Sequence, residues 1–213
     1  MTIATYSGLD ALPKSLRIYG ASDYATMAPK AGKKEPDFTE HGIWGMDAKG
    51  ELWAIDWWSR QCETDIAIAA FIRLVRLWKP VRWFDEGGLI EKAIGPSIRK
   101  AMRDAHAFVA IESLPSLTDK GIRLQAFHAM ATAGVVHLPV KRKWADSLIE
   151  QLVKFPAGRF DDKADVCGLI GRGVDLMYDA QVPVRDLKPL LVPFTEKWIE
   201  FNDKDQKPKV RYY

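Results

Sequence analysis

Apolar and polar positions along this chain follow two different periods. In several short runs apolar residues recur at every second position, which is typical of half-buried strands. In longer runs they recur at every third or fourth position, which is typical of helices packed on one face. The runs with strand character are 16–22, 39–46, 51–58, 81–84, 108–111 and 135–138. The runs with helical character are 62–78, 89–104, 119–133, 144–154 and 161–180.

The order of these runs predicts the fold class. Between the second and third strands lies Asp47-Ala48-Lys49-Gly50, a hairpin turn signal, so the chain opens as an antiparallel three-stranded meander. Helices and short strands then alternate, which favours parallel pairing. We therefore expect an α/β fold, with a mixed sheet of meander plus parallel strands flanked by helices.

Length and composition set the broad class. The chain has 213 residues, of which 47% are hydrophobic, as expected for one globular domain with a tail. We expect a lead-in arm at 1–15, a domain at 16–180 and a charged tail at 181–213. The net charge of +3 permits nucleic acid as a partner without arguing for it. No apolar run approaches membrane-spanning length, so we expect no membrane partner.

The segment Phe155–Asp165 reads FPAGRFDDKAD and brings three aspartates to the start of an apolar helix. Asp165 lies four residues after Asp161 and three after Asp162, so the carboxylates share one helix face. Two interpretations stay open at this point. Either Asp161 caps the helix and the other two aspartates are solvated, or the aspartates bind a divalent metal.

Acidic residues also stand at the ends of two predicted strands. Asp23 ends the first, and Asp85 and Glu86 end the strand after the first helix. Strand ends in an open α/β sheet converge at one edge. Carboxylates that meet there would offer the oxygen ligands that Mg²⁺ or Mn²⁺ prefers.

At these residues the chain resembles the nuclease domain of bacteriophage large terminases, the motor proteins that package viral DNA. The segments that carry the resemblance span roughly 16–178 and are IYGASDYAT, PDFTEHGIWGMD, AIDWWSRQ, WFDEGGLIEKAIGPSIRKAM, DKGIRLQAF and FPAGRFDDKADVCGLIGRGVD. The resemblance implies a ribonuclease H-like fold and a metal-dependent endonuclease that cuts concatemeric DNA. Two departures stand out: Phe160 where many members carry histidine, and Asp85 where a small residue is usual.

The resemblance also implies a set of site residues. The metal ligands would be Asp23, Glu86, Asp161, Asp162 and Asp165, and the catalytic residues Asp23, Glu86, Asp162 and Asp165. Two Mg²⁺ or Mn²⁺ ions would act on the phosphodiester bond, with Asp23 placed to be shared between them. Strand alternation puts Asp85 and Glu86 on opposite faces, so only one of the two should reach the site.

The resemblance further implies partners and a location. These are double-stranded DNA, a terminase ATPase domain, the small terminase subunit and the portal, in the cytoplasm of a bacterial host. The chain has no GxxxxGK[ST] motif to cradle phosphates, because Gly32-Lys33-Lys34 lacks the upstream glycine and the Ser/Thr. We therefore expect a nuclease domain apart from the ATPase, either separate or excised, that does not hydrolyse ATP.

Three groups of basic residues are candidates for contact with DNA phosphates. They are Lys30, Lys33 and Lys34; Lys120 and Arg123; and Lys141, Arg142 and Lys143. A solvated role is the alternative for each. At the level of the whole chain, two other functions stay open: another ribonuclease H-like nuclease, such as a resolvase or exonuclease, and a non-catalytic docking domain.

Overall fold

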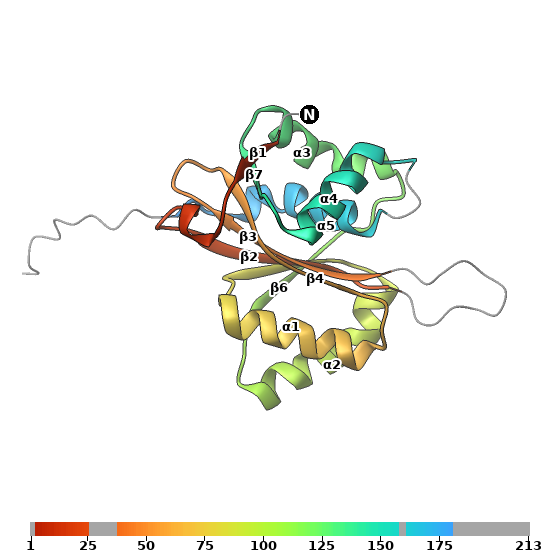
Figure 1. Cartoon of the computed structure of the whole chain (residues 1–213). Coiled ribbons are helices and arrows are strands. Elements are labelled where there is room, and N and C mark those ends of the chain that lie inside the picture. Colours follow the sequence, from red (N-terminus) through yellow and green to blue (C-terminus); the bar gives the residue numbers. More distant parts are fainter. Residues whose placement is uncertain (1–2, 26–37, 158–160, 181–213) are drawn as a thin grey trace, which may run out of the picture. The chain divides into compact units, whose positions relative to one another are not determined.

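The strands that the structure describes form one mixed sheet of seven strands in the order β1-β7-β4-β3-β2-β5-β6 (Figure 1). This computed structural model describes residues 3–25, 38–157 and 161–180. The strands are β1 Ala4–Tyr6, β2 Arg17–Asp23, β3 Thr39–Met46, β4 Leu52–Arg60, β5 Arg82–Glu86, β6 Ala110–Leu114 and β7 Val136–Pro139. The helices are α1 Thr64–Trp78, α2 Leu89–Ala105, α3 Lys120–Thr132, α4 Lys143–Lys154 and α5 Asp162–Arg172.

The predicted meander is confirmed. β3 pairs antiparallel with both β2 and β4, while β5, β6 and β7 join by parallel pairing. All strands except β3 therefore point the same way, so β2 and β5 end at the same edge of the sheet. Helices α1 and α2 cover one face and α3, α4 and α5 the other (Figure 1), as the alternation of helices and strands predicted.

Two boundaries differ from the prediction. Residues 4–6, within the expected lead-in arm, form β1, which pairs parallel with β7 and buries Tyr6. The last helix ends at Arg172 instead of near 180, and a short 3-10 turn, Val174–Leu176, follows. Gly173 sits where an added Cβ would lie 2.8 Å from the Phe84 ring, so the chain leaves the helix tight against the sheet. The predicted tail at 181–213 lies outside the described residues.

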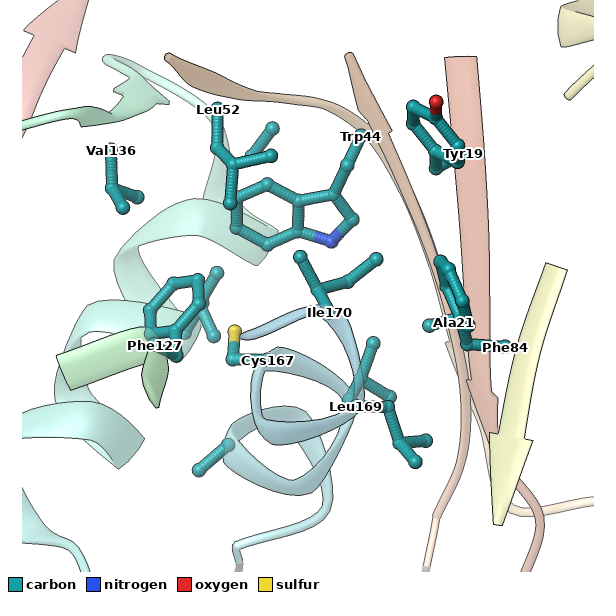
Figure 2. Close-up of a cluster of buried hydrophobic side chains, with 14 of the residues drawn as sticks. Tyr19, Ala21, Trp44, Leu52, Phe84, Phe127, Val136, Cys167, Leu169 and Ile170 are labelled. Atoms are coloured by element: carbon teal, nitrogen blue, oxygen red, sulfur yellow. The ribbon is translucent and has the colours of Figure 1, made fainter. Parts of the chain in front are cut away.

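Helix α5 runs through the core of its face. Figure 2 shows Cys167, Leu169 and Ile170 of this helix among Trp44 and Phe84 of the sheet and Phe127 of α3. Two glycines set the distance between α5 and α3. A Cβ on Gly168 would lie 2.8 Å from the Arg123 carbonyl oxygen, and one on Gly171 would lie 2.5 Å from the Phe127 nitrogen. The two helices therefore approach more closely than any residue with a Cβ would allow.

Candidate active site

Alternation along two neighbouring strands brings Asp23 and Glu86 to the α5 face. Tyr19 and Ala21 of β2 pack in the core under α5, and Asp23 continues that side of the strand. In β5, Phe84 packs in the same core and Glu86 continues its side. Both carboxylates line one small cavity at the carboxyl ends of these strands.

Asp85 lies on the other face of the sheet. Its neighbour Trp83 packs in the core between the sheet and α1, and Asp85 itself lines a cavity with Ile98 and Met102 of α2. The prediction that Asp85 and Glu86 point to opposite faces is therefore confirmed. The structure groups Glu86, and not Asp85, with Asp23.

The first turn of α5 supplies the remaining acids. Asp161 takes the N-cap position, but its side chain makes no capping hydrogen bond. The backbone N–H of Lys163 is instead satisfied by Gln151 Oε1 of α4 at 2.9 Å. Asp162 is buried and Asp165 is half-buried. The side chain of Asp161 thus forms no capping bond. Such a bond was part of one of the two interpretations that the sequence left open.

The carboxylates from these elements act on one another electrostatically. The pKa of Asp23 is raised well above its ordinary value, first by burial and then by the charges of Asp165, Asp162, Glu86 and Glu40. Since each of these charges raises the pKa, β2, β3, β5 and α5 all contribute negative charge to one region. A cation at this place would relieve the repulsion.

One cation of the chain already occupies part of the region. Arg123 Nη1 of α3 lies 3.1 Å from Asp165 Oδ2, and both side chains are largely buried. Arg123 and Arg172 line the same cavity as Asp23 and Glu86. Arg172 Nη2 donates to the carbonyl oxygen of Pro115, the residue that follows β6.

A second, fully buried ion pair lies beside the acids. Glu40 of β3 is the direct cross-strand partner of Asp23 and is 0% exposed. Its carboxylate accepts hydrogen bonds from Lys163 Nζ at 2.7 Å, Trp57 Nε1 at 2.6 Å and Ser59 Oγ at 2.7 Å. Burial raises the pKa of Glu40, while Lys163 and these hydrogen bonds oppose the shift. With three donors in place, Glu40 anchors α5 to the sheet and has little capacity left for a metal.

Sequence reasoning missed Glu40 and Lys163 as part of this region. Glu40, Gly42, Trp44 and Met46 occupy alternate positions of one strand, and Trp44 and Met46 are core residues on the α5 face. That alternation puts Glu40 on the α5 face, and the pairing of β3 with β2 places it opposite Asp23. Lys163, between Asp162 and Asp165, gave no signal, because its partner is 123 residues away.

The donor set fits a hard divalent cation, although the carboxylates are not gathered into a finished cage. Glu86 Oε1 is buried and has no hydrogen-bond partner among the residues that the structure describes, so this oxygen can accept a ligand. Across the described ranges, no group of three or more His, Cys, Asp or Glu side chains is placed to hold a metal ion. In this arrangement Asp165 is instead paired with Arg123.

Of the residues predicted to contact DNA, those described lie in different parts of the structure. Arg123 lies inside the acidic region instead of on an outer surface. Lys141, Arg142 and Lys143 are exposed where β7 leads into α4 and do not line that cavity. Lys120 begins α3, but its side chain is not described. Lys30, Lys33 and Lys34 lie outside the described residues.

Solved structures identify the fold. The large terminase nuclease from thermophilic phage G20c with bound zinc aligns with a TM-score of 0.52 and 12% identity, over 72% of this chain and 79% of that one. The same nuclease with bound magnesium gives 0.52 and 12%, over 75% and 82%. The chain has the fold of a phage large terminase nuclease.

The nuclease domain of the Thermus phage P74-26 large terminase agrees, with a TM-score of 0.51 and 10% identity over 78% of this chain and 84% of that one. The expected ribonuclease H-like fold is thus confirmed. At these identities the likeness to terminase nucleases concerns the fold alone. The sequence itself matches no protein-family model and no curated protein. None of the helices that the structure describes is long and apolar enough to cross a membrane.

Proposed function

We propose that this protein is a metal-dependent endodeoxyribonuclease that cuts DNA during viral genome packaging. The observation that carries the proposal is the position of Asp23. Its carboxyl group lies at the end of β2, where the charges of Glu86, Asp162 and Asp165 all raise its pKa. Four carboxylates from three elements are costly to hold together, and the cost is compensated when a cation binds.

Each acid has a proposed role at the metal site. Asp23 lies between the other elements and would be shared by two ions. Glu86 would hold one ion, and Asp162 the other. Asp165 and Asp161 would complete the ligand set or orient water. When bound, two Mg²⁺ or Mn²⁺ ions supply a hydroxide nucleophile and stabilise the leaving alkoxide of a phosphodiester.

The terminase fold supports the packaging context of the proposal. Of the aligned structures of this fold, one contains bound zinc and another contains bound magnesium. The proposed partners are double-stranded DNA, a terminase ATPase domain, the small terminase subunit and the portal, in the cytoplasm of a bacterial host. With a net charge of only +3, the isolated chain should bind DNA weakly. Tethering to a packaging motor would then supply the local concentration needed for cutting.

A plasmid-nicking assay with Mn²⁺, Mg²⁺ and EDTA tests the proposal. We expect slow, sequence-independent nicking with either metal and none with EDTA. Cleavage should fall as salt rises from roughly 50 to 200 mM, because binding that depends on contacts with DNA phosphates weakens as salt rises. Linear, circular and branched substrates compared side by side distinguish this activity from that of an exonuclease or a resolvase. No metal-dependent cleavage of any of these substrates would point to a docking domain.

A further inference from the structure

We propose that Arg123 is an exchangeable cation of the active site. In the metal-free protein it holds Asp165, and when a divalent ion takes Asp165 the guanidinium turns to a DNA phosphate. The inference rests on the proposed function, since it assumes that the acidic region binds metal and DNA. It adds a specific role for a residue of α3, which contributes none of the proposed metal ligands.

The contacts of Arg123 support both halves of this exchange. Its pairing with Asp165 at 3.1 Å is partly shielded from water, with side-chain exposures of 17% and 19%. Its Nε atom is buried and has no hydrogen-bond partner within the described ranges of the chain. A guanidinium is a planar fork with five N–H donors that matches phosphate geometry. Arg123 therefore retains donor capacity directly beside the cavity.

The position of Arg123 is fixed by the packing of two helices. A Cβ on Gly168 of α5 would lie 2.8 Å from the carbonyl oxygen of Arg123 itself. One turn further, Gly171 makes a similarly close approach to Phe127. The backbone of α3 is thus held against α5 at Gly168, about one helical turn after Asp165. Arg123 is consequently placed by the core of the protein and not by a surface loop.

Charge balance gives the reason for the exchange. Asp165 and Glu86 stand near Asp23 and raise its pKa, so the metal-free region carries excess negative charge that Arg123 partly neutralises. A divalent cation at Asp165 would repel the guanidinium from that carboxylate. A phosphate at the cavity offers the displaced guanidinium the bidentate anion that it favours. Binding of metal should therefore strengthen binding of DNA, and DNA should strengthen binding of metal by the same factor.

The test removes the cation and measures metal affinity without DNA or turnover. Mn²⁺ is titrated into wild-type protein and Arg123→Gln, and free Mn²⁺ is followed by electron paramagnetic resonance. We expect Arg123→Gln to bind Mn²⁺ about fivefold more tightly or better, in the range of typical couplings between sites. Arg123→Lys keeps the charge and should lie closer to wild type. Arg76→Gln removes an arginine of α1 that donates to the Ala105 carbonyl oxygen, and should leave Mn²⁺ affinity unchanged.

The second measurement concerns DNA. Fluorescence anisotropy with a short duplex compares affinity in EDTA and in Ca²⁺, a hard cation with the same preference for oxygen ligands. Ca²⁺ should strengthen binding by wild-type protein, and this gain should be lost in Arg123→Gln. A merely structural arginine would not give tighter Mn²⁺ binding together with loss of the gain in DNA affinity.

The outcomes separate the two proposals. If folded Arg123→Gln binds Mn²⁺ as tightly as wild-type protein or more weakly, and wild-type protein does cut DNA, the inference alone is overturned. Tighter Mn²⁺ binding by Arg123→Gln, with no cleavage by wild-type protein, would support the inference and overturn the nuclease function. If Arg123→Gln does not fold, Arg123→Lys decides. The loss of the bidentate fork should then remove most of the Ca²⁺-dependent gain in DNA affinity, and an undiminished gain would overturn the inference.

Discussion

Neighbouring residues of β2 and β3 point into two very different polar environments. On the α1 face, the Ser22 hydroxyl donates to His41 Nδ1 at 2.7 Å and accepts from Trp83 Nε1 at 2.8 Å, while His41 Nε2 donates to the Ala67 carbonyl oxygen at 3.0 Å. Burial lowers the pKa of His41 to about 4, so this group is neutral at physiological pH. One residue along each strand, Asp23 and Glu40 point to the α5 face, where charges accumulate.

The two faces show the difference between polar groups that stabilise a fold and polar groups that cost stability. The Ser22–His41–Trp83 chain is neutral, and each of its contacts pairs one donor with one acceptor, as buried polar groups require. The Asp23 region gathers like charges, and only part of that charge is balanced by Arg123. Charge held at a cost in this way is typical of a site that binds an ion.

The largest effect should come from removing an acid on the α5 face. Asp23→Ala and Asp162→Ala should each reduce metal-dependent plasmid nicking at least about 100-fold, since even outer partners of metal ligands typically matter 10–100-fold. Both variants should still fold, which circular dichroism checks. Cleavage at the wild-type rate by both would contradict the two-metal hypothesis.

The next prediction compares adjacent residues on opposite faces. Glu86→Gln should inactivate the enzyme, because Glu86 lines the cavity with Asp23. Asp85→Asn should have a mild effect on nicking, because Asp85 faces α2. Initial rates for the pair, measured at equal enzyme concentration, test the assignment. The reverse pattern would move the ligand to Asp85.

A change on the α1 face should affect stability instead of chemistry. Ser22→Ala would leave His41 Nδ1 and Trp83 Nε1 buried without their partner, which costs roughly 1–3 kcal/mol of unfolding free energy. Urea unfolding measures this loss, and nicking per folded molecule should stay at the wild-type level. Ser116→Ala, at an exposed serine in the loop before α3, is the matched control and should change neither quantity. Loss of activity without loss of stability in Ser22→Ala would contradict the prediction that Ser22 stabilises the fold and takes no part in the chemistry.

The smallest effect concerns pH and the charge of Asp23. Its pKa is raised in the folded state, so the folded protein holds the proton more tightly than the unfolded chain does. The stability that this proton brings is complete at pH values below about 3.9, the pKa of the aspartate in the unfolded chain. It is lost as the pH rises through the pKa of the folded state. Asp23→Asn in EDTA should therefore raise the melting temperature at pH 7, and the gain should vanish near pH 3. Asp175→Asn, at an exposed position, serves as the control and should give no comparable gain.

Much of this architecture could be predicted from local patterns. Alternation and the turn at 47–50 predicted the meander, and the same alternation predicted that Glu86 and Asp85 face opposite ways. The pairing of Arg123 with Asp165, and of Glu40 with Lys163, could not be predicted, because these partners are distant in sequence and meet only through packing. The strand at 4–6 was missed as well, since a run of three residues is too short to show a period.

We propose that the acids of the α5 face, and not the polar groups elsewhere, hold a divalent metal. Isothermal titration of Mn²⁺ into wild-type protein, Asp23→Asn and Asp85→Asn tests it most directly. We predict saturable binding to wild-type protein, the same affinity for Asp85→Asn, and at least about tenfold weaker binding to Asp23→Asn. Equal affinity for wild-type protein and Asp23→Asn, or no binding to wild-type protein at all, would contradict the claim.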